Sequence, residues 1–302
     1  MQSLDPQCLD PKITNLIDLQ QLTESSVLHM LRIRFFNHHI YSFVSSILIA
    51  VNPFHEYPIY DQETMDLYRK TNDKRTLPPH IFVTADQAYD SLLLENQSQC
   101  LIISGESGSG KTESIKLILK YITHISSRRG ASCHHPNIQE QILQANPVME
   151  AFGNAKTSRN NNSSRFGKLI TLRFSCGSID EAGIISYLLE KCRVAHHQDG
   201  ERNFHIFYQL IAATLNDFEL ATELGMTNSH EDYIYASRHE VGSVSTINDL
   251  NDFHELNAAM KVISLIVFGS EVSQILGLSD MNRKTVFRIV AGILHLGNIG
   301  TC

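Results

Sequence analysis

The stretch Gly105-Glu106-Ser107-Gly108-Ser109-Gly110-Lys111-Thr112 (GESGSGKT) decides the fold class of this chain. It matches GxxxxGK[ST], the pattern of a glycine-rich loop that joins a strand to a helix and binds phosphates. Cys100 to Ile103, directly before it, predicts a short buried strand. After it, apolar residues recur at the spacing of one helix face: Ile115, Ile118, Leu119 and Ile122. The sequence therefore predicts a strand, loop and helix unit at residues 100 to 125.

The chemistry of this loop suits a nucleoside triphosphate. Glycines let consecutive backbone N–H groups converge on the phosphates, and the helix that follows adds the positive end of its dipole. Lys111 would reach the β- and γ-phosphates, and Thr112 would give its hydroxyl to Mg²⁺. The alternative is an ordinary glycine-rich turn with an incidental lysine. The loop alone leaves kinases, GTPases, motors and other ATPases open, although we find no NKxD motif of the guanine-nucleotide proteins.

Composition and charge exclude several classes of protein. The chain has 302 residues, of which 42% are hydrophobic and 19% charged, so it can bury a large core and is not mainly disordered. Its 25 Lys and Arg against 32 Asp and Glu give a net charge of −7, which argues against a general nucleic-acid or anionic-membrane binder. No apolar run is long enough to span a bilayer, and residues 1 to 10 do not resemble a secretory signal. We therefore expect a cytoplasmic location.

Neither the cysteines nor the histidines predict a metal site, so the Mg²⁺ site beside the glycine-rich loop is the one metal site that we expect. Six cysteines are scattered without a CxxC pair, and in a chain without a secretory signal we expect them to be reduced and buried. Three pairs of adjacent histidines occur, but neighbouring side chains diverge on both helices and strands, which disfavours shared coordination.

The order of apolar patterns along the chain is that of an α/β protein. Thr23 is an expected N-cap for a helix whose apolar face holds Val27, Leu28, Leu31 and Phe35. The β-rich run 41 to 51 ends at Asn52-Pro53, and a second helix follows Pro78-Pro79. Two strands are expected at 168 to 174 and 183 to 188. Two helical stripes follow in the carboxyl third: Phe253, Leu256, Met260 and Ile263, and then Val286, Ile289, Val290, Ile293 and Leu294, the second bounded by Asp280 and Gly297.

A second polar segment, Asn160 to Arg165 (NNNSSR), gathers small hydroxyl and amide groups around one guanidinium. Such groups can coordinate a metal, orient a water molecule and hold a phosphate oxygen. Asn and Ser are also the usual residues of turns, so an ordinary polar loop is the alternative.

Together, GESGSGKT and the segment Glu150 to Lys168 (EAFGNAKTSRNNNSSRFGK) closely resemble the myosin motor domain, in which the second segment is the nucleotide-sensing first switch. Further segments are similar to myosins and stand in the same order: 52–60 (NPFHEYPIY), 79–82 (PHIF), 141–151 (QILQANPVMEA), 187–194 (YLLEKCRV), 201–210 (ERNFHIFYQL) and 291–298 (AGILHLGN). The resemblance covers about residues 10 to 298.

The resemblance implies a fold and two regions. The fold is α/β, the P-loop NTPase core of a myosin motor with a mixed sheet flanked by helices and a helical carboxyl segment. Residues of about 10–175 would form the nucleotide-binding core, with the adenine loop, the P-loop and the first switch. Residues of about 176–302 would form an incomplete part of the upper actin cleft.

The resemblance also implies roles for individual residues. On the adenine side the ATP contacts would come from Asn52, Pro53 and Tyr60. The P-loop contacts would come from residues 105 to 112 and from Glu113, and Asn160 would touch phosphate oxygens. Thr112 and Ser164 would hold Mg²⁺. The catalytic group would be Lys111, Asn160, Ser163 and Arg165, with Ser163 placing the attacking water. Ser109 stands where alanine is common in myosins, and His55 and Glu56 stand where basic residues are common.

The function implied is the ATP-binding portion of an actin-based motor that couples Mg-ATP hydrolysis to binding and movement along actin filaments, in the cytoplasm and actin cytoskeleton. A light chain or calmodulin would bind only a longer form. In myosins Arg165 would pair with a glutamate of the second switch, and that segment is absent from this sequence. We therefore expect little or no hydrolysis by this chain alone. The alternative is a truncated, non-catalytic nucleotide- or partner-binding regulator; a small-molecule kinase would need an acceptor site and lid arginines that we do not find.

Overall fold

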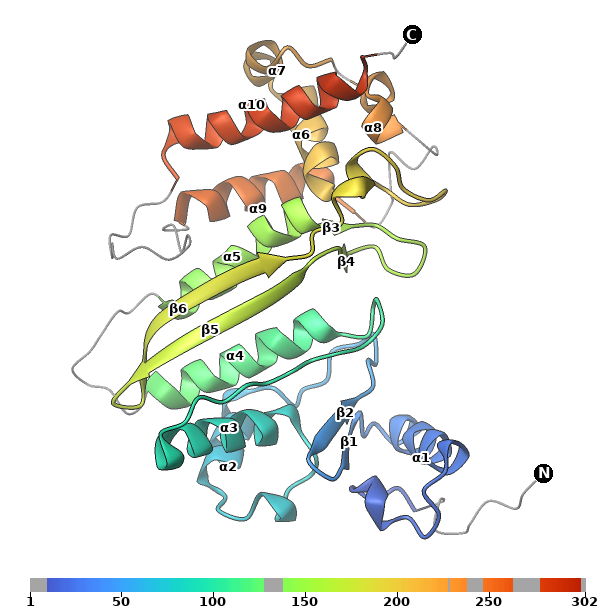
Figure 1. The fold of residues 1–302 in the computed structure, drawn as a ribbon, viewed down its shortest axis with the longest axis vertical. Coiled ribbons are helices and arrows are strands. Elements are labelled where there is room, and N and C mark those ends of the chain that lie inside the picture. The colour runs from blue at the N-terminus through green and yellow to red at the C-terminus, as the bar shows by residue number, and fades with distance from the viewer. Residues whose placement is uncertain (1–9, 128–137, 228, 238–246, 263–277, 300–302) are drawn as a thin grey trace. The chain divides into compact units, whose positions relative to one another are not determined.

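The computed structural model describes residues 10–127, 138–227, 229–237, 247–262 and 278–299 (Figure 1). The chain divides into two compact units. The first unit contains Met1–Cys133 with Cys176–Ser178, and the second contains His134–Ser175 with Ile179–Cys302.

The first unit begins with a short helix and a hairpin around a small apolar core. A 3₁₀ turn, η2 (Leu16–Asp18), precedes helix α1 (Glu24–Phe36) and the antiparallel strands β1 (Tyr41–Val44) and β2 (Ile47–Ala50). Thr23 caps α1 as expected, because its side chain and that of Ser26 accept each other's backbone N–H in a capping box. The predicted apolar face is partly wrong: Leu28 is 69% exposed, while Met30 is fully buried.

Arg34 lies on the buried side of α1, which the predicted apolar face describes only in part. This residue is only 2% exposed, although it is charged. Its guanidinium donates to the Ser42 hydroxyl and the Tyr41 carbonyl, both at 2.8 Å, and to the carbonyls of Pro11 and Ile13. A buried charge is tolerated when its donors are satisfied in this way. An apolar pattern does not detect such an inward-facing cation.

Three helices complete the first unit. They are α2 (Gln62–Lys70), α3 (Ile81–Glu95) and α4 (Lys111–Ser127), with the 3₁₀ turn η3 (Lys74–Thr76) between the first two. Their core is apolar and aromatic, and it includes Ile118, Leu119 and Ile122 of the stripe predicted for α4. Its buried residues are Ile81, Phe82, Ala85, Tyr89, Ile118, Leu119, Tyr121 and Ile122. Asp86, fully buried on α3, lies among Arg69 at 2.8 Å, Lys74 at 2.8 Å and the Tyr121 hydroxyl at 2.8 Å.

The strand expected at Cys100 to Ile103 is not present. This segment has no regular secondary structure, Cys100 and Ile102 are exposed, and no described strand pairs with it. A strand is defined by the hydrogen bonds that a neighbour supplies, so an apolar run without a neighbour stays irregular. The described strands form three two-stranded sheets, β1–β2, β3–β4 and β5–β6, and no mixed sheet is seen among them.

The second unit contains two hairpins and a group of helices. Helix α5 (Ile138–Gly153) leads into β3 (Asn154–Ala155) and β4 (Ser163–Ser164), and then into the paired strands β5 (Gly167–Ser175) and β6 (Ser178–Tyr187). The two predicted strands at 168–174 and 183–188 are thus confirmed within a longer hairpin. The helical elements that follow are η4 (Lys191–Val194), α6 (His205–Asn216), α7 (Phe218–Leu224), η5 (His230–Asp232), α8 (Ile234–Ser237), α9 (Asp249–Val262) and α10 (Asp280–Gly297).

Helix α6 is the centre of this unit. It contacts α5, α7, α9 and α10, and its residues are buried on almost every side (Figure 1). The predicted residues Phe253, Leu256 and Met260 of α9 face this core, whereas Ile263 lies outside the described residues. Helix α10 has the predicted bounds, with Ser279 as its N-cap. Its Ile289 is 59% exposed, so the inward stripe is Phe287, Val290, Ala291 and Leu294.

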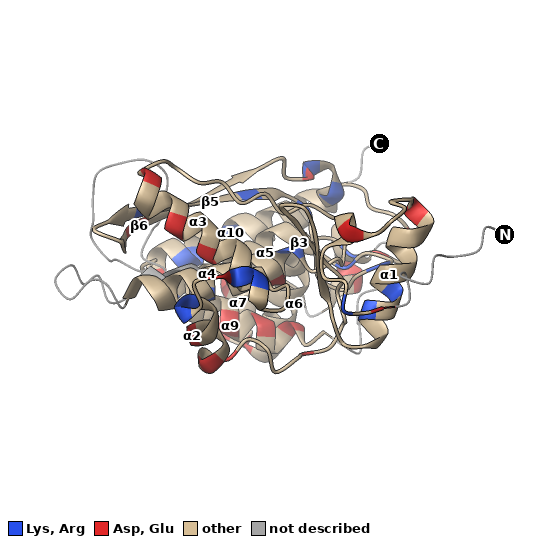
Figure 2. Ribbon diagram, turned by 90° about the horizontal axis from the view of Figure 1, so that it is seen from below, with Lys and Arg blue, Asp and Glu red and all other residues tan. Residues whose placement is uncertain are grey.

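The surface shows mixed charge and free thiols. Basic and acidic residues occur together on the same elements, as α1 and α2 illustrate in Figure 2.

The described cysteines Cys100, Cys176 and Cys192 are free, as expected, but all are exposed, so the predicted burial is wrong for them. Cys176 has a positive φ of 51° in the turn of the β5–β6 hairpin, where a side chain projects from the sheet. Among the described residues, none of the helices has both the length and the apolar content that crossing a bilayer requires.

Candidate functional site

The glycine-rich loop, residues 105–110, closes tightly against the start of α4. Gly108 and Gly110 have φ values of 79° and 91°, which L-residues rarely adopt, so glycine is needed at both positions. Lys111, the first residue of α4, turns back over the loop, and its ammonium donates to the carbonyls of Gly105 and Glu106, both at 2.8 Å. A flexible cation and the positive end of a 17-residue helix therefore meet at one loop.

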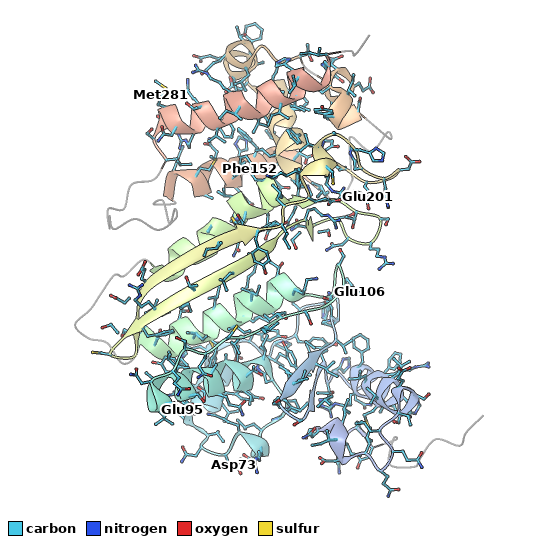
Figure 3. The ribbon with its side chains drawn as sticks, in the orientation of Figure 1. Asp73, Glu95, Glu106, Phe152, Glu201 and Met281 are labelled. Atoms are coloured by element: carbon cyan, nitrogen blue, oxygen red, sulfur yellow. The ribbon has the colours of Figure 1, made fainter. Side chains whose placement is uncertain are left out.

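This arrangement fits an anionic ligand such as a polyphosphate. Residues 105–107 are exposed, and Figure 3 shows Glu106 at the tip of the loop. Thr112 lies in the first turn of α4, directly after the loop. Glu113 follows it and pairs with Lys116 at 2.9 Å. The contacts of these residues with phosphate and Mg²⁺ stay predictions of the sequence.

Asn52 links the adenine-side loop, residues 52–60, to the glycine-rich loop. Its side-chain amide donates to the Gly108 carbonyl at 2.8 Å, while its side-chain oxygen accepts the N–H of Phe54 at 3.0 Å. A second link joins the far end of the loop to α4, because the Lys120 ammonium donates to the Tyr60 carbonyl at 2.9 Å. Pro53 lies between these links and is half-buried. Two loops that are distant in sequence are therefore fixed to each other within one unit.

Tyr60 is held by a group of aromatic rings centred on His80. Its hydroxyl is 2.8 Å from that of Tyr41, and its ring lies 5.4 Å from the His80 ring. His80 stacks on Tyr68 with ring centres 4.9 Å apart and lies 4.3 Å from the Phe82 ring. Its Nδ1 accepts the Phe82 N–H at 3.1 Å, which caps α3. Burial lowers the pKa of His80 to about 4, so the ring is neutral near pH 7.

The nearby departures from the myosin pattern lie at the surface. His55 and Glu56 are both exposed, and the His55 ring lies 5.7 Å from that of Tyr57. The Tyr57 hydroxyl is 3.0 Å from Nδ1 of His38. No bond joins His55 or Glu56 to the glycine-rich loop in the contacts of the described residues, in contrast to Asn52.

The second unit carries the other predicted residues on one switch loop, defined as residues 156–165. The strands β3 and β4 bring its two ends together, with Ala155 opposite Ser163 and Asn154 opposite Ser164. Ser163 is 3% exposed, whereas Ser164 is exposed. Asn160 shapes the turn between the strands: its side-chain oxygen accepts the Asn162 N–H at 3.1 Å, and its amide donates to the Asn162 carbonyl at 3.2 Å.

Arg165 pairs with Glu190, a carboxylate that the sequence analysis did not assign to it and that is not the expected glutamate of the second switch. Its Nε lies 2.6 Å from Oε2 of Glu190, and its Nη1 donates to the Ser163 hydroxyl at 3.3 Å. Burial acts to raise the pKa of Glu190, but hydrogen bonds from Arg165 and Arg193 outweigh it, so the pKa lies below its usual value. The guanidinium of the switch loop is therefore neutralised by a residue of the same chain.

Sequence reasoning assigned no role to the residues that hold the switch loop. Glu190, Arg193 and Glu201 stand in two segments that were identified only by their resemblance to myosins. A usable signal was present for Glu201, which stands before the apolar run of α6 and is 6% exposed. No such signal was present for Arg193, which is 3% exposed, because Leu188 and Leu189 before it are exposed.

The structure thus brings the predicted residues together in two groups. In the first unit, Asn52 is hydrogen-bonded to the glycine-rich loop, and Tyr60 is hydrogen-bonded to Lys120 of α4, the helix that follows this loop. Asn160, Ser163, Ser164 and Arg165 share the switch loop in the second unit.

Comparison with known proteins gives the family to which these groups belong. The family model described as myosin head (motor domain) matches residues 13–301. The chain belongs to the myosin head family. The resemblance drawn from the two motifs is therefore confirmed. The P-loop NTPase fold of that family agrees with the expected fold class, although the expected mixed sheet is not seen among the described strands.

The similar myosins come from several organisms. The chain is 41% identical over 288 residues to Myosin-I heavy chain of Dictyostelium discoideum, covering 95% of this chain and 11% of that protein. It is 40% identical over 289 residues to Unconventional myosin-VIIb of Mus musculus, covering 95% of this chain and 13% of that protein. It is 42% identical over 279 residues to Unconventional myosin IC of Drosophila melanogaster, covering 92% of this chain and 25% of that protein. The chain therefore spans a quarter or less of the length of these relatives.

Proposed function

We propose that this myosin head chain binds Mg-ATP and forms the nucleotide-binding part of an actin-based motor. The observation that carries the proposal is the glycine-rich loop, with the Lys111 ammonium 2.8 Å from two of its carbonyls and Asn52 joining it to the adenine-side loop. The membership of the myosin head family supports a motor rather than a kinase or a GTPase. Cytoplasmic localisation on the actin cytoskeleton belongs to the same proposal.

Each residue has a proposed role in the site. The loop N–H groups and Lys111 hold the phosphates, and residues Asn52, Pro53 and Tyr60 hold the adenine side. Asn160 contacts phosphate oxygens, Ser163 places the attacking water, and Arg165 supports the closed loop. Thr112 and Ser164 would hold Mg²⁺, which when bound neutralises charge on the phosphates. Hydrolysis would be an in-line attack of water on the γ-phosphate, accelerated mainly by positioning.

The organisation into a nucleotide-binding core at about 10–175 and an upper actin cleft segment at about 176–302 remains part of this proposal. The proposed partner is the actin filament, and a light chain or calmodulin would be added only in a longer form. The second candidate is a nucleotide-binding regulator without turnover. The Arg165–Glu190 pair, at 2.6 Å, favours this candidate, because the guanidinium is engaged by a carboxylate of the same chain.

A nucleotide titration tests the proposal. Binding of a fluorescent ATP analogue to the chain is measured with Mg²⁺, for the wild type and for Lys111→Ala. We expect the variant to lose about a hundredfold in affinity, because charge-assisted hydrogen bonds to phosphate disappear. Lys70→Ala is the matched control, since Lys70 is 74% exposed on α2 and its nearest ion-pair oxygen is 4.0 Å away. Equal affinity in wild type and Lys111→Ala, or no binding by the wild type, would refute the proposal.

Two further assays separate the motor from the regulator. Phosphate release measures turnover, and cosedimentation with filamentous actin measures ATP-sensitive binding. Turnover together with ATP-sensitive sedimentation supports the motor. Nucleotide binding without either supports the regulator.

A further inference from the structure

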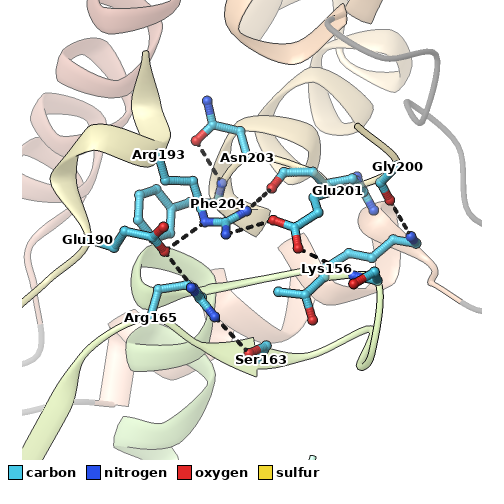
Figure 4. Close-up of polar contacts among 12 residues, drawn as sticks. Lys156, Ser163, Arg165, Glu190, Arg193, Gly200, Glu201, Asn203 and Phe204 are labelled. Carbon is cyan, nitrogen blue, oxygen red and sulfur yellow. Dashed lines mark hydrogen bonds and ion pairs between the residues drawn. The ribbon is translucent and has the colours of Figure 1, made fainter. Parts of the chain in front are cut away.

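Four side chains of alternating charge form a continuous chain in the second unit (Figure 4). Oε2 of Glu190 lies 2.6 Å from Nε of Arg165 and 3.0 Å from Nε of Arg193. Nη2 of Arg193 lies 2.8 Å from Oε2 of Glu201. Each inner member therefore pairs with two partners of opposite charge. We refer to Arg165, Glu190, Arg193 and Glu201 as the charge chain.

The charge chain reaches both ends of the switch loop. At the start of the loop, the other oxygen of Glu201 accepts the Ser158 N–H at 3.4 Å. At the end of the loop, Arg165 binds Glu190 through its side chain, and the Arg165 carbonyl accepts the Glu190 N–H at 2.9 Å. A single set of ion pairs thus connects the two ends of the loop across its base.

Backbone contacts beside the charge chain hold the same segment. The Lys156 ammonium donates to the Gly200 carbonyl at 2.7 Å, and the Lys156 carbonyl accepts the Arg202 N–H at 3.0 Å. The remaining Nη1 of Arg193 donates to the Arg202 carbonyl at 3.0 Å. Arg193 is therefore bonded by both glutamates and by the backbone that carries Glu201.

Burial makes the pair Arg193–Glu201 sensitive to change. The side chains of Arg193 and Glu201 are 3% and 8% exposed. An ion pair in such a place is little screened by solvent, and removal of one partner leaves an uncompensated charge. The pair Arg173–Glu181 in the β5–β6 hairpin has a similar distance of 2.9 Å, but its side chains are 75% and 62% exposed. That pair offers a matched comparison in which little is expected from loss of the carboxylate.

We propose that Glu190, Arg193 and Glu201 are positioning residues that fix the two ends of the switch loop and so place Asn160, Ser163 and Arg165 toward a nucleotide. The consequence for the nucleotide rests on the proposed function, whereas the fixing of the loop does not. Because the contacts of the switch loop are assigned to the γ-phosphate and to Mg²⁺, the charge chain should affect binding of a triphosphate with Mg²⁺ more than binding of a diphosphate without it.

Hydrogen exchange tests the fixing of the loop without any nucleotide. The variants are Glu190→Gln and Glu201→Gln, which keep the side-chain shape and remove the charge, and the control is Glu181→Gln. Exchange is followed in peptides that cover residues 156–162 and, as a check of the fold, in peptides of α6. We expect exchange of the loop to become about tenfold faster in the first two variants, since a charge-assisted hydrogen bond is lost, and to stay unchanged in the control.

Nucleotide titrations of the same variants test the consequence for binding. We expect Glu190→Gln to weaken binding of a non-hydrolysable ATP analogue with Mg²⁺ about tenfold and binding of ADP without Mg²⁺ less than twofold, because the bonds of Glu190 to Arg165 and Arg193 lose their charge assistance. A general loss of folding would lower both affinities together and would also speed exchange in α6. Glu190 is the milder variant, because its side chain is 32% exposed while that of Glu201 is 8% exposed.

Each outcome decides between the two claims. Unchanged exchange in residues 156–162 overturns the positioning role. Equal acceleration in the loop and in α6 also overturns it, since the residues would then only support the fold. Faster loop exchange with unchanged triphosphate binding overturns the link to the nucleotide. If the wild type binds no nucleotide, the proposed function fails, and the exchange result alone then decides whether the charge chain fixes the loop.

Discussion

The ring of His80 should make the stability of the first unit depend on pH in a defined window. In the folded protein, burial lowers the pKa of His80 to about 4, against 6.5 for an ordinary histidine. This difference corresponds to about 3 kcal/mol in the free energy of unfolding. Above pH 6.5 the ring is neutral in both states and the contribution is complete. Between pH 6.5 and 4 only the unfolded chain takes up the proton, so stability falls by about 1.4 kcal/mol per pH unit.

The variant His80→Asn isolates this effect. Asparagine keeps a side-chain acceptor for the Phe82 N–H that caps α3, but it does not titrate. The variant loses the ring contacts with Tyr68 and Phe82, so it should be less stable than wild type at pH 7. That difference should shrink by about 3 kcal/mol between pH 7 and pH 4, because only the wild type loses the histidine contribution. His205, whose pKa burial also lowers to about 4, is present in both proteins and cancels.

Urea titrations at pH 7, 6, 5 and 4 measure this difference, with hydrogen exchange of α3 peptides as the readout of the first unit. Tyrosine fluorescence is less selective, since the chain has 10 tyrosines and no tryptophan. A stability difference between wild type and His80→Asn that stays constant over this range would refute the reasoning. It would mean that the folded protein protonates His80 as readily as the unfolded chain does.

Three further substitutions in the first unit have expected outcomes. Asp86→Asn removes the fully buried carboxylate between two cations, and should lower the free energy of unfolding in urea by about 3–5 kcal/mol. The control Asp90→Asn, at a 42% exposed side chain, should lower it by about 1 kcal/mol or less. Asn52→Ala breaks the link between the two loops and should weaken binding of a fluorescent ATP analogue about tenfold, while unchanged affinity would contradict the role of that link. Gly110→Ala meets no atom closer than 3.7 Å but requires a φ of 91°, so backbone strain alone should cost about 1–3 kcal/mol in the same urea assay, and a neutral result would show that the loop relaxes.

Features that depend on neighbouring residues in the sequence could be predicted. The N-cap at Thr23 depends only on its own hydroxyl and on that of Ser26 three residues later. The bounds of α10 were predicted from Asp280 and Gly297, whereas its capping residue, Ser279, was not. The glycine-rich loop belongs to this class as well, because its conformation is limited to glycine at Gly108 and Gly110.

Features that depend on distant partners could not be predicted in the same way. Cys100 to Ile103 has the composition of a buried strand, yet a strand forms only where another strand supplies hydrogen bonds. Arg34 faces inward because its guanidinium donates to the carbonyls of Pro11 and Tyr41, which come from two distant parts of the chain. The spacing of apolar residues along α1 does not predict these partners. Glu190 is 25 residues from Arg165, so its pairing follows from the β5–β6 hairpin between them and not from a motif.

The charge chain also constrains how this region can change during evolution. Two cations and two anions alternate along it, so their charges sum to zero. Replacement of any one member by a neutral residue leaves a net charge next to the buried Arg193, whereas loss of an adjacent pair restores neutrality. Substitutions at these four positions should therefore occur in pairs. Among many sequences of this family, they should appear as correlated columns that link Arg165 of the switch loop to Glu201, which lies just before α6.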